Sequence, residues 1–297
     1  MKRLFLSLLL SMLLHAPQVF ASDILVIQSL EIKPYSEALQ GCRSVCKKRT
    51  QRLISSDFSE EELTAKVRKY APDLILAIGQ DALTKVRGIR DVPIVYLMVL
   101  NPQSLVREGG NVTGVSMNIA PERQLSQLRQ FLPHVGKICV LFDPGKSGEF
   151  VTRAHGAASS MELNLLTKGV HSPREAVAAV YGMKGKIDAL WLLPDTTVIS
   201  PETIDLLLLS SIQNRIPVFT FSEKYAEKGA LLSLEIDPAE VGRQAGEMAN
   251  RILTGTNVKG IAMEDARVGI MTVNMIVAKK LGIAINGNVF KQARVIK

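Results

Sequence analysis

Residues 74–97 read LILAIGQDALTKVRGIRDVPIVYL. A continuous apolar run, Leu74–Ile78, ends at Gly79, helical spacing follows from Asp81 to Val86, and a second apolar run occupies Val92–Leu97. Strands that are apolar on both faces are typical of parallel sheets covered by helices on both sides. This stretch therefore predicts a strand-helix-strand unit of an α/β protein.

The same alternation continues along the chain on both sides of this unit. Further strands are predicted at 24–27, 53–54, 137–142, 163–166, 189–193, 218–221, 231–236 and 268–273, and further helices at 35–48, 59–67, 124–132, 147–161, 173–181, 201–213, 238–253 and 275–281. Glycines interrupt the pattern between Asn101 and Ser116, which indicates a boundary between two sets of units. The predicted fold class is α/β, with two Rossmann-like lobes built on parallel sheets.

Two of the predicted helices begin at recognisable capping residues. Ser59 is followed three positions later by Glu62, which is the pattern of a capping box. Asp237 precedes Pro238, a pair typical of an N-cap followed by the first helical turn. Both helix starts are therefore predicted from local chemistry alone.

The first residues have the composition of a secretory signal peptide. Lys2 and Arg3 form a positive start, the run Leu4–Leu14 is apolar, and Val19-Phe20-Ala21 offers a cleavage site. The run is shorter than the ~20 apolar residues of a membrane span, and an uncleaved anchor is the alternative. Residues 1–21 are therefore expected to be removed by cleavage near Ala21, which leaves the mature chain in the periplasm.

Charge and cysteine content exclude several classes of protein. The chain carries a formal net charge of +8, but its one tight basic cluster, Lys47-Lys48-Arg49, is interpreted as a solvated helix end. Export argues against a nucleic-acid partner. Three cysteines, Cys42, Cys46 and Cys139, form no disulfide framework. Cys42 and Cys46 share a helical face, where core packing or a facultative disulfide is favoured over a metal or redox pair.

No motif of catalysis or cofactor binding stands out. The chain has no G-x-G-x-x-G fingerprint, complete P-loop or G-x-S-x-G elbow, and His134, His155 and His171 are not paired at metal-ligand spacing. Asp143 and Asp195 each follow a predicted strand and could act as acid and base in an enzyme. Without a nucleophile or cofactor, a binding protein with no cofactor and no metal is the favoured interpretation.

Polar and aromatic residues follow the predicted strands. Ligands of open parallel sheets bind outside the carboxyl ends of the strands, so these residues are the candidate ligand site. They are Ser29, Tyr35, Gly79, Gln80, Asp81, Met98, Asn101, Asp143, Ser147, Asp195, Thr196, Phe221 and Ser222. Helix capping is the alternative role for Asp81, Asp143, Ser147 and Asp195.

Asp195 is the residue expected to contact the ligand most directly. It follows the apolar strand at 189–193, and its carboxylate is expected to be open to water and to accept hydrogen bonds from a ligand ammonium. Helices that begin directly after several of these loops favour an anionic group. Together these features fit a small amino-acid-like zwitterion, whose identity the sequence does not give.

Blocks along nearly all of the mature chain resemble one known family. The chain resembles the ABC-transporter substrate-binding proteins of the type I periplasmic-binding fold, in the branch that includes tryptophan- and tyrosine-binding members. The blocks are Pro72-Asp73-Leu74-Ile75, Val92-Pro93-Ile94-Val95, Gly109-Gly110-Asn111-Val112-Thr113-Gly114, Asp143-Pro144-Gly145, Pro194-Asp195-Thr196, Ile216-Pro217-Val218-Phe219, Lys228-Gly229-Ala230-Leu231 and Gly242-Arg243-Gln244-Ala245-Gly246.

The resemblance implies how the chain is divided and what it contacts. It implies a first lobe of 22–115 with 237–258 and a second lobe of 116–236 with 259–297, joined by a hinge of three segments. The ligand would lie between the lobes of a monomer, and a membrane permease and ATPase would receive it. A periplasmic module that reports to a membrane receptor is the alternative, because the same cleft would serve both.

Three positions depart from the family pattern. The family often has Asp where this chain has Asn101, commonly Ser-Asp where it has Phe221-Ser222, and often a small or aromatic residue near Glu235. All three positions are expected to face the cleft, which makes Glu235 a further candidate ligand residue. The ligand is therefore not required to be an aromatic amino acid.

Overall fold

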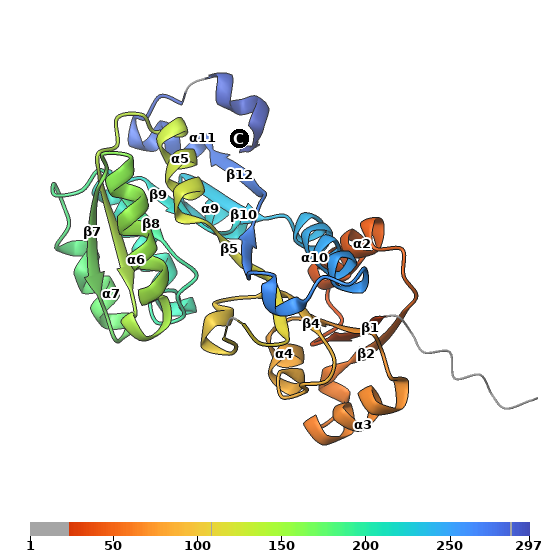
Figure 1. Cartoon of the computed structure of the whole chain (residues 1–297). Coiled ribbons are helices and arrows are strands. Elements are labelled where there is room, and N and C mark those ends of the chain that lie inside the picture. The colour runs from red at the N-terminus through yellow and green to blue at the C-terminus, as the bar shows by residue number, and fades with distance from the viewer. Residues whose placement is uncertain (1–23, 108, 286) are drawn as a thin grey trace, which may run out of the picture.

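The computed structural model describes residues 24–107, 109–285 and 287–297, so the predicted signal peptide lies outside the described residues. The chain forms two α/β lobes, each built on a sheet of its own (Figure 1). Over these described ranges, no helix is both long and apolar enough to cross a membrane.

The first sheet is parallel throughout. Its strand order is β11-β5-β4-β3-β1-β2. The strands are β1 (Ile24–Gln28), β2 (Thr50–Ile54), β3 (Leu74–Ile78), β4 (Ile94–Val99), β5 (Val112–Ile119) and β11 (Glu264–Ala266). β1, β3 and β4 are buried along their whole length, as their continuous apolar runs predict.

The second sheet has one antiparallel pair, between β10 and β12. Its order is β13-β12-β10-β9-β8-β6-β7, and its other neighbours are parallel. The strands are β6 (Lys137–Phe142), β7 (Asn164–Gly169), β8 (Ala189–Leu192), β9 (Val218–Thr220), β10 (Leu232–Ile236), β12 (Gly269–Asn274) and β13 (Ala293–Ile296).

Helices cover both sheets. In the first lobe they are α2 (Lys33–Val45), α3 (Glu60–Tyr70), α4 (Gln80–Val86) and α10 (Pro238–Leu253), and in the second α5 (Pro121–Phe131), α6 (Pro144–Ser160), α7 (Pro173–Tyr181), α8 (Pro201–Gln213), α9 (Glu223–Lys228) and α11 (Met275–Leu281). Both predicted caps form: the backbone N–H of Glu62 donates to Ser59 Oγ at 3.2 Å, and Asp237 Oδ1 accepts from the N–H of Ala239 at 2.9 Å.

The chain passes between the lobes three times. β5 of the first sheet leads into α5, β10 of the second sheet leads into α10, and β11 of the first sheet leads into β12. α10 packs along α2 of the first lobe, although more than 190 residues separate them (Figure 1). The two lobes are therefore interleaved along the chain, because each is built from two separate segments.

The first sheet extends past the predicted lobe boundaries. β5 continues to Ile119, which pairs with Ala266, so the chain leaves this sheet after 119 rather than at 115. β11 also belongs to this sheet, although 259–297 was assigned to the second lobe. The glycines of the 101–116 segment, interpreted as a break, in fact precede and enter a buried strand.

The three cysteines are buried and form no disulfide. Burial, with a smaller contribution from Cys46, raises the pKa of Cys42 to about 12. Burial also raises the pKa of Cys139 to about 11. The thiols of Cys42 and Cys139 are consequently protonated at neutral pH, as expected of core packing rather than reactive or metal-binding groups.

Candidate functional site

A cavity of about 320 Å³ lies between the two lobes, at the carboxyl ends of their central strands. Residues from both lobes line it: Leu100, Asn101, Met117, Asn118, Ile119, Gln124, Ser147, Phe150, Leu193, Pro194, Phe221, Ser222, Leu234, Glu235 and Ile236. Its volume falls in the range of small-molecule sites, which runs from ~300 to ~1,000 Å³. This cavity is the candidate ligand site.

Five of the residues predicted from the sequence line the cavity. They are Asn101, Ser147, Phe221, Ser222 and Glu235. Asn101 also connects the lobes, because its Nδ2 donates to the carbonyl of Lys146 at 3.2 Å and its Oδ1 accepts from Asn118 at 3.2 Å. It adopts a left-handed backbone conformation with φ of 47°, which asparagine tolerates better than most residues.

The wall of the cavity is mostly apolar. Leu193, Leu234 and Ile236 contribute aliphatic surface, and Phe150 and Phe221 contribute rings. The Phe221 ring lies edge-on to the ring of Tyr225, with centroids 5.3 Å apart. Such a wall favours a ligand with an apolar body and a few polar groups that fix its orientation.

Glu235 is the charged residue of this lining. It lies near the end of β10, where the chain turns towards α10. Its Oε1 accepts from Ser222 Oγ at 3.2 Å, and its Oε2 accepts from the backbone N–H of Glu223 at 3.4 Å. Both donors are neutral, and the second contact is long, so the carboxylate keeps acceptor capacity towards the cavity.

Asp195 has a different environment from the one its sequence position suggests. Its side chain belongs to a residue only 1% exposed, and the expectation of a carboxylate open to water is therefore wrong. Oδ2 accepts from the N–H of Asp143 at 2.8 Å and from Ser147 Oγ at 2.7 Å, and Oδ1 accepts from the N–H of Thr197 at 2.9 Å. These bonds hold the loops after β6 and β8 together.

Asp143 and Thr196 also make contacts within the second lobe. Asp143 accepts from Thr197 Oγ1 at 2.7 Å and from the N–H of Gly145 at 2.9 Å, and these two bonds lower the pKa of its carboxyl. Thr196 Oγ1 accepts from Lys146 Nζ at 2.6 Å. The capping alternative therefore describes Asp143 better than ligand binding does.

Apart from Asn101, the first-lobe candidates lie outside the lining of this cavity. Ser29, Tyr35 and Gly79 do meet: a Cβ at Gly79 would lie 2.6 Å from both Ser29 Oγ and Tyr35 Oη. Ser29 Oγ accepts from the N–H of Ala82 at 2.9 Å, and burial raises the pKa of Tyr35. Ser29 and Gly79 follow β1 and β3, so this group lies at the carboxyl edge of the first sheet.

The remaining first-lobe candidates have structural surroundings. Asp81 accepts from Ser55 Oγ at 2.5 Å and pairs with Lys85 at 3.2 Å. Gln80 is exposed at the start of α4. Met98, only 4% exposed, packs in the core of the first lobe. The sheet-edge rule therefore selected the correct edge, but not which side chains face the cavity.

Three of the ten lining residues that the sequence analysis missed come from one missed strand. Met117, Asn118 and Ile119 belong to β5, which was interpreted as part of the lobe boundary. Gln124 lines the cavity while its Nε2 donates to the carbonyl of Ile119 and its Oε1 accepts from Trp191 Nε1. Phe150 follows Ser147 by three positions on α6, a helical spacing that could have revealed it.

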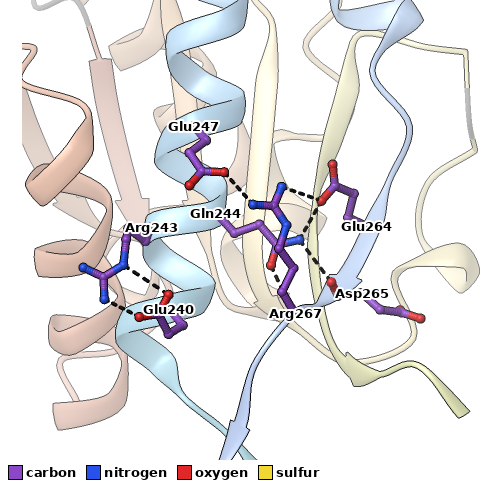
Figure 2. Close-up of polar contacts among 7 residues, drawn as sticks. All are labelled: Glu240, Arg243, Gln244, Glu247, Glu264, Asp265 and Arg267. Atoms are coloured by element: carbon purple, nitrogen blue, oxygen red, sulfur yellow. Dashed lines mark hydrogen bonds and ion pairs between the residues drawn. The ribbon is translucent and has the colours of Figure 1, made fainter. Parts of the chain in front are cut away.

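A second cavity, of about 740 Å³, lies beside the crossings and is lined largely by charged residues. Arg153 of α6 pairs with Asp265 of β11 at 2.5 Å, and Ser116 Oγ donates to the same carboxylate at 2.7 Å. Figure 2 shows Arg267 between Glu247 of α10 and Glu264 of β11, at 2.6 and 3.0 Å. The charged side chains named here pair with one another, and the pair of Arg153 and Asp265 joins the second lobe to the first. This region is therefore interpreted as a contact that connects the lobes.

Within the same region, Gln244 of α10 fastens the helix to the edge strand. Its Nε2 donates to Glu264 Oε2 at 2.7 Å and to the carbonyl of Asp265 at 3.1 Å, and its Oε1 accepts from the N–H of Arg267 at 3.2 Å (Figure 2). Glu240 and Arg243 pair on the neighbouring face of α10. The first-lobe side of the hinge is thereby tied to α10.

Two parallel-type α/β sheets joined by crossing segments, with a cavity between them, define the type I periplasmic-binding fold. The chain belongs to the ABC transporter substrate binding protein family, whose model matches residues 46–297. Members of this family bind substrates and are not enzymes, which confirms the predicted family, fold class and binding role.

Individual relatives agree with this assignment. A tyrosine-binding protein of Clostridioides difficile is 28% identical over 210 residues, which cover 68% of this chain and 60% of the relative's length. The ligand-free, open structure of a substrate-binding protein with adhesive properties from Clostridium difficile gives a TM-score of 0.74 at 22% identity, covering 93% of this chain and 99% of the other. An ABC domain from Streptococcus pneumoniae in complex with L-Trp gives 0.61 at 23% identity, covering 92% and 100%.

Proposed function

We propose that this chain captures a small amino-acid-like ligand in the cavity between its lobes and delivers it to a membrane permease and ATPase. The observation that carries the proposal is the cavity lining, with an apolar wall, amide and hydroxyl groups, and the single carboxylate of Glu235. The names of the relatives support it, because one binds tyrosine and another was solved with L-Trp.

The proposed place of action is the periplasm. The support is the N-terminal sequence, in which a positive start, an apolar run and a cleavage site follow one another over residues 1–21. A binding protein in that compartment would meet solutes before they cross the inner membrane. The permease and ATPase follow from the family rather than from any surface of this chain.

Ligand titration tests the proposal. Purified mature protein is titrated with each of the common amino acids, and its melting temperature is recorded. We expect at least one apolar or aromatic amino acid to raise the melting temperature, because a ligand at a hundred times its Kd stabilises the folded state by ~2.7 kcal/mol. Calorimetry would then give the Kd and stoichiometry.

A variant with a blocked cavity provides the control. Met117→Trp places a large ring in the cavity and should abolish the thermal shift. Met161→Trp makes the same change at the far end of α6, outside the cavity, and should leave the shift intact. If no amino acid binds, or if both variants respond alike, the ligand class or the site is incorrect.

A further inference from the structure

Glu235 differs from Asp143 and Asp195, the other two acidic candidates at this edge of the second sheet. Asp195 receives three hydrogen bonds and Asp143 receives two, all from the protein itself. Asp265, at the crossings, pairs with Arg153. Glu235 receives only a hydroxyl and a long backbone contact, at 3.2 and 3.4 Å. A charged partner for its carboxylate would therefore have to enter the cavity.

The cavity provides no such partner from its own lining. Its lining contains no Lys, Arg or His among the described residues. Neighbouring basic side chains are engaged elsewhere: Lys146 donates to Thr196, Arg153 pairs with Asp265, and Arg294 pairs with Glu223. A carboxylate beside an apolar wall loses hydration when the cavity is filled, and this cost is offset only by a charge that binds it.

The same lining has consequences for an anionic group on the ligand. A ligand carboxylate would find the amides of Asn101 and Asn118 there, but no cation. The hydroxyls of Ser147 and Ser222 already donate their protons to Asp195 and Glu235. Neutral donors bind an anion with weaker hydrogen bonds than a guanidinium or ammonium does. The ammonium end of a ligand is thus favoured by charge, whereas the carboxylate end is not.

We infer that Glu235 is the specificity-determining residue of the cavity and that it binds the ammonium group of a primary amine with an apolar body. The ligand carboxylate is dispensable, so the substrate class includes decarboxylated amines as well as amino acids. This inference rests on the proposed function, since it assumes that the cavity between the lobes is the ligand site.

Three related compounds separate the two ends of the ligand. Tyrosine carries both charged groups, tyramine lacks the carboxylate, and the deaminated analogue of tyrosine lacks the ammonium. Calorimetric titration of the parent should show tyramine within about tenfold of tyrosine. The deaminated analogue should bind roughly thirty-fold more weakly or worse, which is ~2 kcal/mol at ~1.4 kcal/mol per tenfold.

Glu235→Gln then tests the residue, with Glu223→Gln as the matched control. Glu223 is the neighbouring acid; its side chain pairs with Arg294 and does not line the cavity. Glu235→Gln should weaken tyrosine and tyramine by roughly thirty-fold and leave the deaminated analogue unchanged. Glu223→Gln should leave all three affinities unchanged, and melting curves verify that both variants fold.

Each other outcome has a definite meaning. If tyrosine and its deaminated analogue bind equally, or Glu235→Gln changes nothing, the inference is overturned while the proposed function stands. If tyrosine binds and tyramine does not, the carboxylate is required and the inference is overturned as well. If tyramine binds and no amino acid does, the inference stands and the proposed amino-acid ligand fails. If none of the amines or amino acids binds, both are wrong.

Discussion

Asp195 is expected to matter for folding stability rather than for affinity. Its carboxylate accepts three hydrogen bonds while the residue is 1% exposed. Asp195→Asn keeps the shape but replaces one acceptor oxygen by a donor, which leaves at least one buried donor unpaired at a cost of ~1–3 kcal/mol. Thermal unfolding should show a melting temperature lower by several degrees, at ~2–4 °C per kcal/mol.

Asp205→Asn provides the comparison for this prediction. Asp205 pairs with Lys228 on the surface, and its side chain is 64% exposed, so its loss should change stability by less than ~0.5 kcal/mol. Ligand affinity of folded Asp195→Asn should stay within a few-fold of the parent. If Asp195→Asn melts like the parent but binds the ligand far more weakly, Asp195 contacts the ligand and this prediction is wrong.

The two carboxylates show how much of the site a sequence reveals at the residue scale. Strand ends are readable from apolar runs, so Asp195 was selected as a cleft residue by its position, whereas Glu235 was selected only through the family resemblance. Which of them is exposed depends on donors brought by other loops, including the N–H of Asp143 and the hydroxyl of Ser147, more than 45 residues away. The tertiary fold brings these donors together, so no local sequence pattern reveals them.

The crossing of α2 and α10 depends on two glycines. A Cβ at Gly242 would lie 1.8 Å from the carbonyl oxygen of Ala38, and one at Gly41 would lie 2.0 Å from that of Ala239. Because backbone atoms are the obstacle, Gly242→Ala must separate the two helices. We expect a loss of at least ~1–3 kcal/mol by chemical denaturation, despite the better helix propensity of alanine.

Gly156→Ala is the matched control within α6. A Cβ there would meet nothing within 4 Å, and the position is exposed inside the helix. Alanine should therefore stabilise the protein by ~0.5–1 kcal/mol. Equal behaviour of Gly156→Ala and Gly242→Ala would show that the helices cross with more space than the structure indicates.

The bounds of helices and strands were predicted best where the local sequence carries a clear start or stop signal. The helices at Pro173–Tyr181, Pro201–Gln213 and Pro238–Leu253 were predicted to the residue, since each has a capping residue and a proline at its start. β5 was missed because Thr113, Ser116 and Asn118 interrupt its apolar pattern. Two of these polar groups are satisfied by residues 262–265, nearly 150 positions later.

For the whole molecule, we expect ligand to bring the two lobes closer together. The cavity lies between lobes that are joined by three crossings, and a ligand that contacts both favours the arrangement in which both contacts form. Small-angle scattering should show a smaller radius of gyration when a bound amino acid saturates the protein. The measurement needs only the parent protein and its ligand.

Met117→Trp serves as the control for closure. With its cavity filled, it should give the same scattering profile with and without the amino acid. If the scattering profile of the parent is unchanged when the amino acid saturates it, the lobes bind the ligand without moving. At this scale the sequence predicted two lobes correctly, because the strand-helix units repeat along the chain. The return of α10 to the first lobe was predicted only from the family resemblance, and the return of β11 was not predicted.

The interleaving of the two lobes along the chain affects the order in which the protein can mature. A polypeptide emerges from its N-terminus, yet α10 packs along α2, and the first sheet receives its edge strand from residues 264–266. Cys42 lies at that covered face, where Gly246 approaches its backbone. Until residue 253 has emerged, α10 is incomplete and the face of α2 that carries Cys42 stays uncovered. Protection of the Cys42 thiol would therefore report that synthesis is almost complete and that the first lobe can finish folding.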